Sequence, residues 1–323
     1  MATQTQPKFE LKLGAATREA FGRALVEVGR ANKDVVACDA DLSKSTMTSY
    51  FAKEFPDRFI ECGIAEANMV AIAGGLAYAG KIPFASSFSA FVINKAFEQL
   101  RVVVAYPNTN VKIVGTHSGI SIGEDGPSQM SVEEIGLACS LPGFCVFSPA
   151  DEVSMKAIVH LAAEHVGPVF IRAGRVKAPI IYGPDQKFEI GKAVQLTDGK
   201  DVTLMATGLL VSESLKAAEQ LEAAGISARV LDFHTIKPLD DAAIAKAAAE
   251  TGAIVVSEEH LVDGGLGVRI AQAVCQSNPC VMEFVGLTGY AESGSPDELL
   301  DKYGMRASSI VAAAKKAVAR KAK

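Results

Sequence analysis

Several side chains of this chain could do acid–base or binding chemistry, and they follow predicted strands. Asp39 and Asp41 come after the first predicted strand, Glu66 after the second and His117 after the fourth, while Arg172 ends the sixth. Because ligands of open parallel sheets bind beyond the carboxyl ends of the strands, these side chains are expected to converge at one edge. Carboxylates, an imidazole and a guanidinium in one place suit general acid–base catalysis and the binding of an anionic ligand.

Glu66 is the residue among them whose surroundings are most unusual. It stands where an apolar strand candidate, residues 59–62, leads into an apolar helix candidate, residues 69–79. A carboxylate in apolar surroundings is costly unless it is protonated, paired or hydrogen-bonded, so Glu66 needs a partner. Cys62 lies close by in sequence, but no histidine does, and a buried, inert thiol is the simpler interpretation.

Taken alone, each of these residues has an ordinary structural explanation. An aspartate that follows a strand is commonly a helix cap or turn residue. Phe88 and Phe91 lie at helical spacing, which is more typical of core residues than of a platform for a ligand. A single histidine in a loop is usually solvated. The convergence of all of them at one edge, rather than any one residue, favours a functional site.

The elements that must position these residues alternate along the chain. Short apolar runs predict strands at residues 35–38, 59–62, 83–86, 111–114, 144–147 and 169–172, and helical stretches lie between them, including residues 91–104, 132–139 and 152–164. Strands that are apolar throughout are typical of a parallel sheet covered by helices on both faces.

A second alternation follows a turn at Tyr182-Gly183-Pro184-Asp185, with strands predicted at residues 202–206, 228–232, 253–257 and 281–284. The chain is therefore predicted to be an α/β protein with two doubly wound, mainly parallel-sheet domains. We place the first domain at residues 12–183 and the second at residues 184–323.

Composition narrows the classes of function. The chain has 323 residues, of which 49% are hydrophobic and 21% charged, and its net charge of −5 argues against nucleic acid as a partner. The longest apolar segment is too short for a membrane span, and the first ten residues lack the apolar core of a signal peptide. Six cysteines without a Cys-x-x-Cys pair indicate reduced thiols in a cytoplasmic protein and no metal site.

Four runs read together are specific, and they occur in this order: Asp39-Ala40-Asp41-Leu42, Gly63-Ile64-Ala65-Glu66-Ala67-Asn68-Met69, Ser87-Phe88-Ser89-Ala90-Phe91 and Gly123-Glu124-Asp125-Gly126-Pro127-Ser128-Gln129. They resemble the pyrimidine-binding domain of transketolases, which are thiamine diphosphate enzymes. The second half resembles the transketolase C-terminal domain through His234-Thr235-Ile236-Lys237-Pro238-Leu239-Asp240, Gly264-Gly265-Leu266-Gly267 and Glu292-Ser293-Gly294.

One family motif is missing. Transketolases hold the diphosphate and Mg²⁺ through a Gly-Asp-Gly…Asn motif in an N-terminal domain, and no such motif occurs in this sequence. The resemblance therefore implies the C-terminal half of a split transketolase. A separate N-terminal subunit would then supply the Mg²⁺ and diphosphate site, and this chain would also contact its own copy in a homodimer.

The resemblance implies a cofactor role for five residues. Glu66 matches the glutamate that hydrogen-bonds the aminopyrimidine ring nitrogen of thiamine diphosphate and so takes part in catalysis. Phe88 and Phe91 match the aromatic residues that pack on this ring, and Asp41 and Ile64 match positions near the cofactor. A tyrosine common in the family is replaced by Asn94, so that part of the pocket is altered.

The resemblance also implies substrate contacts. His117 matches a second catalytic residue, which together with Asp125 contacts sugar hydroxyls and phosphate. Positions that match phosphate ligands or donor-sugar contacts of the family are Arg18, Ser45, Arg172 and Gln129. Gln129 stands where many members have histidine, and an amide can hydrogen-bond there but not titrate.

The reaction that this family resemblance implies is transfer of a two-carbon ketol unit from a ketose phosphate to an aldose phosphate. Three alternatives remain open at the level of sequence. Two share the fold and the glutamate: a 1-deoxyxylulose-5-phosphate synthase and the beta subunit of a 2-oxo-acid dehydrogenase. The third is a non-catalytic binding subunit, which would leave the set of Glu66, His117, Asp125 and Arg172 without a purpose.

Overall fold

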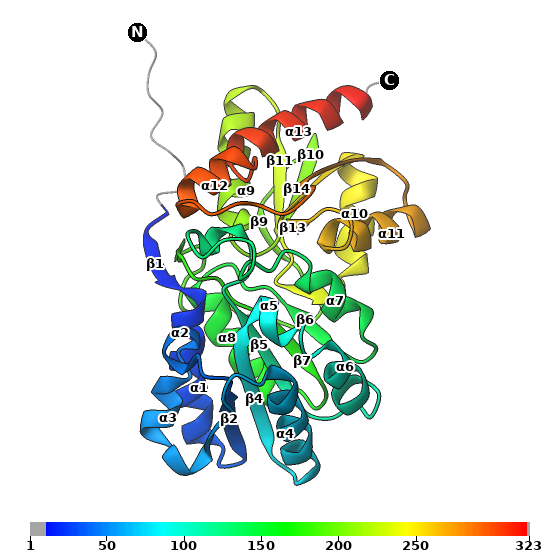
Figure 1. Cartoon of the computed structure of the whole chain (residues 1–323). Coiled ribbons are helices and arrows are strands. Elements are labelled where there is room, and N and C mark those ends of the chain that lie inside the picture. The colour runs from blue at the N-terminus through cyan, green and yellow to red at the C-terminus, as the bar shows by residue number, and fades with distance from the viewer. Residues whose placement is uncertain (1–10, 322–323) are drawn as a thin grey trace.

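The computed structural model describes residues 11–321, and the remaining terminal residues lie outside the described part. It contains a seven-stranded sheet, a five-stranded sheet and a two-stranded ribbon, with helices packed around the sheets (Figure 1). The predicted α/β class with two mainly parallel sheets is confirmed. No helix within residues 11–321 combines the length and the apolar character that crossing a membrane requires.

The seven-stranded sheet has the order β12-β6-β7-β5-β4-β2-β3. Its strands are β2 (Val35–Asp39), β3 (Phe59–Glu61), β4 (Ile82–Phe88), β5 (Lys112–Thr116), β6 (Cys145–Phe147), β7 (Val169–Arg172) and β12 (Thr235–Lys237). The first six pair in parallel, as their apolar character predicted, whereas β12 is antiparallel to β6. Strand β12 was not predicted, because three residues are too few to show an alternation of apolar and polar side chains.

Helices surround this sheet. They are α1 (Thr17–Ala31), α2 (Ser43–Thr46), α3 (Ser49–Glu54), α4 (Glu66–Tyr78), α5 (Ser89–Val92), α6 (Phe97–Gln99), α7 (Glu134–Ser140) and α8 (Glu152–Glu164), with short 3₁₀ turns η1 (Pro56–Arg58) and η3 (Ile120–Ile122). The single helix expected over residues 91–104 is wrong. The segment divides into α5, α6 and a π-helical turn η2 (Leu100–Ala105), because Ala96 has a non-helical backbone.

The five-stranded sheet has the order β14-β13-β10-β11-β9, in which β9 alone is antiparallel to its neighbour. Its strands are β9 (Val194–Thr197), β10 (Val202–Ala206), β11 (Ala228–Asp232), β13 (Ala253–Leu261) and β14 (Val281–Leu287), and its helices are α9 (Leu210–Ala223), α10 (Asp241–Thr251), α11 (Leu266–Gln276), α12 (Pro296–Lys302) and α13 (Ala307–Lys321). The ribbon pairs β1 (Leu13–Ala16) with β8 (Lys177–Pro179). The predicted boundary at residue 183 falls between β8 and β9.

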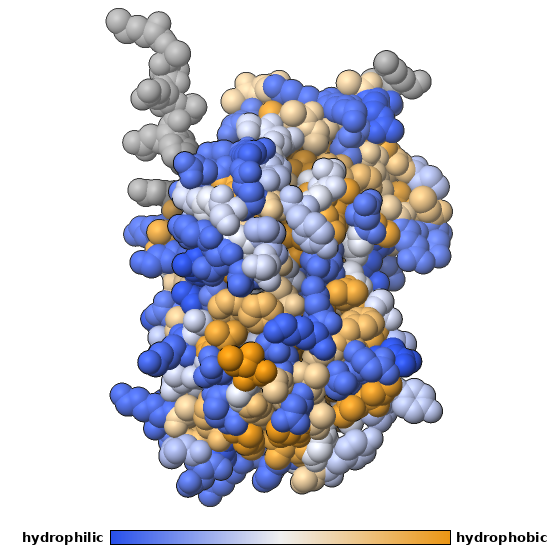
Figure 2. Space-filling view, in the orientation of Figure 1, coloured by the Kyte–Doolittle hydropathy of each residue, from blue (hydrophilic) through white to orange (hydrophobic). Residues whose placement is uncertain are grey.

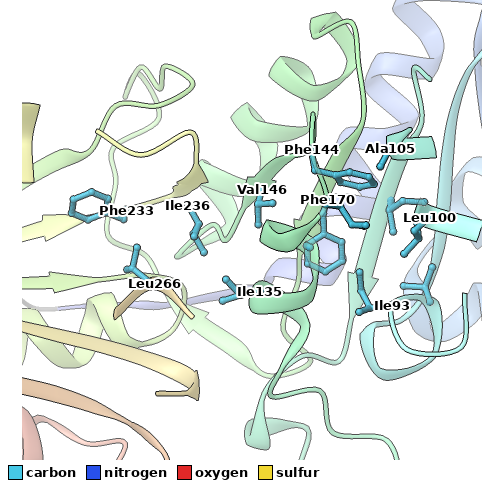
Figure 3. Close-up of a cluster of buried hydrophobic side chains, with 14 of the residues drawn as sticks. Ile93, Leu100, Ala105, Ile135, Phe144, Val146, Phe170, Phe233, Ile236 and Leu266 are labelled. Carbon is cyan, nitrogen blue, oxygen red and sulfur yellow. The ribbon is translucent and has the colours of Figure 1, made fainter. Parts of the chain in front are cut away.

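One of the buried hydrophobic clusters spans both halves of the chain. Phe144, Val146 and Phe170 of the first half belong to the same buried cluster as Phe233 and Leu266 of the second (Figure 3). A continuous core of this kind resists relative motion, because sliding one half would open cavities in close-packed side chains. The strand ends on either side of the junction are therefore held in fixed positions relative to one another.

Candidate active site at the carboxyl edge of the seven-stranded sheet

Glu66 is the first residue of α4, and its surroundings explain how a buried carboxylate is tolerated there. The residue is 4% exposed, and the Lys95 ammonium lies 3.3 and 3.4 Å from its two carboxylate oxygens. A negative charge at a helix N-terminus is further favoured by the helix dipole. The structure therefore provides an ionic partner for Glu66, which the sequence analysis required but did not identify.

An aromatic stack leads away from this ion pair. The Lys95 ammonium lies 4.4 Å from the centroid of the Phe91 ring, and Phe91 stacks on Phe88 with centroids 5.6 Å apart. Phe88 in turn stacks on the His117 imidazole at 3.8 Å. The two phenylalanines come from the end of β4 and from α5, so the stack joins two parts of the predicted site. Their alternative interpretation as plain core residues does not describe Phe91, which keeps an exposed part.

His117 is a buried, neutral base whose tautomer follows from its neighbours. The Arg18 guanidinium donates to His117 Nε2 at 3.3 Å, so Nδ1 carries the proton and donates to Thr116 Oγ1 at 2.9 Å. Burial, reinforced by the positive charges of Arg18 and Arg175, lowers the pKa of His117 to about 3. The backbone of His117, directly after β5, has φ +58°, which a non-glycine residue rarely adopts.

Cations gather at the far end of the stack. Arg18 and Arg175 are close enough that their like charges lower the pKa of Arg18, after the larger effect of burial. Arg18 Nη1 donates to the Ser45 carbonyl at 2.8 Å, but Arg18 Nε is buried and has no hydrogen-bond partner among the described residues. A buried donor without a partner is costly, so this cluster of Arg18, Arg175, Ser45 and His117 suits a phosphate-like anion.

Arg172 occupies a different environment from the one predicted. Its guanidinium is 6% exposed, donates to the Glu134 carboxylate at 2.5 Å and to the Glu259 carbonyl at 2.8 Å, and has the Glu259 carboxylate at 3.8 Å. Two carboxylates already neutralise it, so its surroundings do not support the predicted phosphate contact. Arg175, three residues later and 33% exposed on its side chain, is the arginine beside His117 and was missed.

Asp39 organises the segment that carries Asp41 and Ser45. Its carboxylate accepts hydrogen bonds from Leu42 N at 2.7 Å and from the hydroxyls of Thr46 and Thr48 at 2.7 and 2.8 Å. Burial raises the pKa of Asp39 to about 6, against the opposing effect of these bonds. Asp41 itself is exposed with φ +62°, and its N–H donates to Glu61 Oε1.

The loop of residues 123–129 is held against the second half of the chain. Gly123 has φ +87°, and an added Cβ would lie 3.0 Å from Pro296. Asp125 is exposed and Gln129 half-buried, so both side chains are available at the surface of this loop. A cavity of about 490 Å³ opens beside the loop, and one of its lining residues, Asn94, donates to Glu133 at 3.1 Å.

The remaining predicted residues lie as follows. Ile64 precedes Glu66 and is 76% exposed, so its side chain projects from the edge of the site. Cys62 is half-buried rather than fully buried, which corrects that part of the expectation. Among residues 11–321, no group of three or more His, Cys, Asp or Glu side chains is arranged to hold a metal ion.

These residues suit one end of thiamine diphosphate. The Lys95 ammonium touches both the Glu66 carboxylate and the Phe91 ring face, which shows that these two groups face one common position. A carboxylate beside an aromatic face is what a flat, nitrogen-containing ring requires. For a diphosphate and its metal ion, the described part of the chain offers no carboxylate cluster.

Comparisons with known proteins identify the family of the chain. The family model "Transketolase, pyrimidine binding domain" matches residues 14–179, and "Transketolase, C-terminal domain" matches residues 191–310. The chain is 43% identical to the "Putative transketolase C-terminal section" of Methanocaldococcus jannaschii, over 91% of this chain and 93% of that protein.

Two further relatives show how much of a transketolase this chain corresponds to. The chain is 42% identical to transketolase-like protein 2 of Mus musculus over 97% of its own length, but it spans only 50% of that longer protein. A solved structure described as "Split gene transketolase, inactive beta4 tetramer" is 47% identical, with a TM-score of 0.90 over 95% of this chain and 100% of that one.

Proposed function

The chain belongs to the transketolase family, in which it corresponds to the pyrimidine-binding and C-terminal domains, and we propose that it is one subunit of a two-subunit transketolase. In this proposal the complete enzyme transfers a two-carbon ketol unit from a ketose phosphate to an aldose phosphate. The 1-deoxyxylulose-5-phosphate synthase and 2-oxo-acid dehydrogenase alternatives have no particular support from the relatives described above.

The observation that carries the proposal is the stack of rings between Glu66 and the Arg18–Arg175 cluster. Phe91, Phe88 and His117 connect a carboxylate at one end with two guanidinium groups at the other. A cofactor ring at the carboxylate and a phosphate at the guanidinium groups would thus be held at fixed separation on one rigid edge. Holding two reacting molecules in this way is a large part of catalysis.

At the carboxylate end, Glu66 would accept or donate a hydrogen bond to the aminopyrimidine ring, and Phe91 would pack on its face. Phe88 stacks on Phe91 and would support it, and in this proposal Ile64 and Asp41 would border the same position. Thiamine diphosphate, when bound, supplies the carbanion chemistry of ketol transfer. The chain's own contribution is to orient the ring and to hold a proton at Glu66.

At the other end, Arg18 and Arg175 would bind the substrate phosphate through charge and paired N–H donors. Neutral His117 would accept a hydrogen bond from a sugar hydroxyl at Nε2, in place of the one from Arg18, since its pKa of about 3 keeps it unprotonated near neutrality. Asp125 and Gln129, whose side chains are at least partly exposed, would contact the sugar from the loop of residues 123–129. Arg172 would support the site from its buried position, by joining α7 to β13.

The diphosphate and Mg²⁺ would be held by an N-terminal partner subunit. Support comes from the longer relative, of which this chain spans half, and from the lack of a carboxylate cluster in residues 11–321. Exposed apolar side chains on and near α4 and η2 offer a contact surface, either for that subunit or for a second copy of this chain: Ile64, Tyr78, Val102 and Tyr106. In Figure 2, apolar residues gather in the lower part of the view, where Figure 1 places α4 and the seven-stranded sheet.

Co-expression with the candidate N-terminal subunit tests the function. The complex should transfer two carbons from xylulose 5-phosphate to ribose 5-phosphate, and Glu66→Gln should lower kcat by about 100-fold or more. Glu54→Gln is the matched control, since Glu54 is exposed and pairs only with Arg30 among the described residues. Full activity of Glu66→Gln would overturn the assignment, as would transfer by this chain without a partner.

A further inference from the structure

Lys95 contacts both halves of the proposed ring site, the Glu66 carboxylate and the Phe91 ring. Its ammonium lies 3.3 and 3.4 Å from the Glu66 oxygens and 4.4 Å from the Phe91 centroid. A cation placed between a carboxylate and an aromatic face is attracted both by the negative charge of the carboxylate and by the electron-rich face of the ring. No pattern in the sequence singled out this residue.

We propose that Lys95 is an internal competitor for the cofactor ring: its ammonium occupies the ring position in the free chain and leaves when the ring binds. The inference rests on the proposed function, which supplies the ring. Its physical basis is exclusion, because an ammonium 4.4 Å above Phe91 leaves no room for a flat ring to stack on that same face.

The structure allows Lys95 to leave easily. Its side chain is 53% exposed, compared with 5% for Glu66, and residues 93–96 form a turn rather than part of a helix. A long, half-exposed lysine can move its charge into water at small cost. Glu66 cannot move in the same way, because it is fixed at the start of α4.

The ion pair with Lys95 also explains how the buried Glu66 carboxylate is tolerated when no cofactor is bound. A buried carboxylate that loses its ionic partner destabilises the fold strongly, so the free chain needs a substitute for the ring nitrogen. Lys95 provides that substitute until the ring replaces it. The affinity of the assembled enzyme for thiamine diphosphate is then lowered by the free energy required to displace Lys95.

Zero-length cross-linking measures the occupancy of the pair directly. A water-soluble carbodiimide should join Glu66 to Lys95 as an amide in the free chain, with the lost water taken up by the reagent as its urea. Peptide mass spectrometry should then show the cross-link falling at least about five-fold when partner subunit, Mg²⁺ and saturating thiamine diphosphate are present. An undiminished cross-link in a complex that has bound the cofactor would overturn the inference and leave the proposed function intact.

Affinity gives the second measurement. In the complex with the partner, Lys95→Met should bind thiamine diphosphate about 3- to 10-fold more tightly by calorimetry, because the competing ion pair and ring contact are gone. Lys53→Met, which removes an exposed charge elsewhere, should leave affinity unchanged, and Lys95→Arg should retain the competition. Weaker binding by Lys95→Met would overturn the competitor role, since Lys95 would then assist the bound ring. Failure of every variant and of the wild type to bind would instead overturn the proposed function, together with this inference.

Discussion

Arg172 and Arg175 lie three residues apart, yet one is a structural cation and the other a candidate ligand. Arg172 is enclosed by Glu134 and Glu259, whereas Arg175 reaches the surface beside His117. Removing Arg172 would leave the buried carboxylates of Glu134 and Glu259 without a cation, so the change would mainly lower the stability of the fold. Arg175 is half-buried and pairs with Glu124 at the surface, so its removal should cost anion binding more than folding.

We therefore expect Arg172→Met to lower the free energy of unfolding by about 3–5 kcal/mol. Arg175→Met, which loses the Glu124 ion pair and the hydrogen bond to the Ile122 carbonyl, should lower the free energy of unfolding by only about 1 kcal/mol and raise KM for a phosphorylated donor by about 10- to 100-fold. Urea titration and steady-state kinetics on the assembled enzyme measure the two effects. The reverse pattern, with Arg172→Met stable and impaired only in donor binding, would restore the phosphate role of Arg172.

Asp232 gives a pH prediction at the same scale. Its buried carboxyl accepts a hydrogen bond of 2.5 Å from Tyr182, and burial raises its pKa from 3.8 to about 8. The folded state holds this proton more tightly than the unfolded state does. The contribution of Asp232 to stability is therefore fully present below about pH 4 and is lost as the pH rises through about 8.

Asp232→Asn keeps an acceptor for Tyr182 and removes the titration. Between about pH 4 and pH 8, the wild type should lose up to about 1.4 kcal/mol of unfolding free energy per pH unit relative to Asp232→Asn. Chemical denaturation at several pH values provides the measurement. Parallel stability curves for the two proteins would show that Asp232 ionises normally.

At the scale of elements, the segment after β2 depends on one buried acceptor. Asp39 holds residues 42–48 by three hydrogen bonds, and this segment presents the Ser45 carbonyl to Arg18. Asp39→Ala should cost about 1–3 kcal/mol, because the Leu42, Thr46 and Thr48 donors lose their partner. Asp39→Ala should also raise KM for the donor sugar phosphate, since the displaced segment no longer presents the Ser45 carbonyl that positions Arg18.

Asp39→Asn is the matched control for that change. An amide can accept from Leu42 N and donate to a threonine hydroxyl, so stability and KM should stay close to wild type. Thermal unfolding and donor titration are measured on the same samples. If Asp39→Ala lost stability while KM stayed unchanged, the segment would not position the donor.

The elements also show how far sequence reasoning reaches. Strands of the first sheet and the placement of Glu66 at the start of α4 follow from short apolar runs, because these are local signals. The pairing of Lys95 with Glu66 spans 29 residues and depends on a turn that interrupts an expected helix. The surroundings of Arg172 depend on Glu259, which is 87 residues away, so no local pattern distinguishes Arg172 from Arg175.

At the scale of the whole molecule, the shared core predicts that the two halves unfold together. Phe233 is fully buried and belongs to the same cluster as Phe144 and Phe170 of the other half. Phe233→Ala should cost about 3–5 kcal/mol. Hydrogen exchange should show protection falling together in β7 and β13, because both sheets depend on the common core. A loss of protection confined to β13 would show instead that the two halves unfold independently.

Strand β12 has a consequence for how such a chain can be divided. Although it belongs to the second half in sequence, it covers the edge of β6, and Lys237 donates to two carbonyls at the end of α7. A cut between β8 and β9 would leave β6 with a bare edge, which invites pairing with other chains. Gene fission or domain exchange at that junction would therefore be selected against, and recombination should preserve the two halves as a single heritable unit.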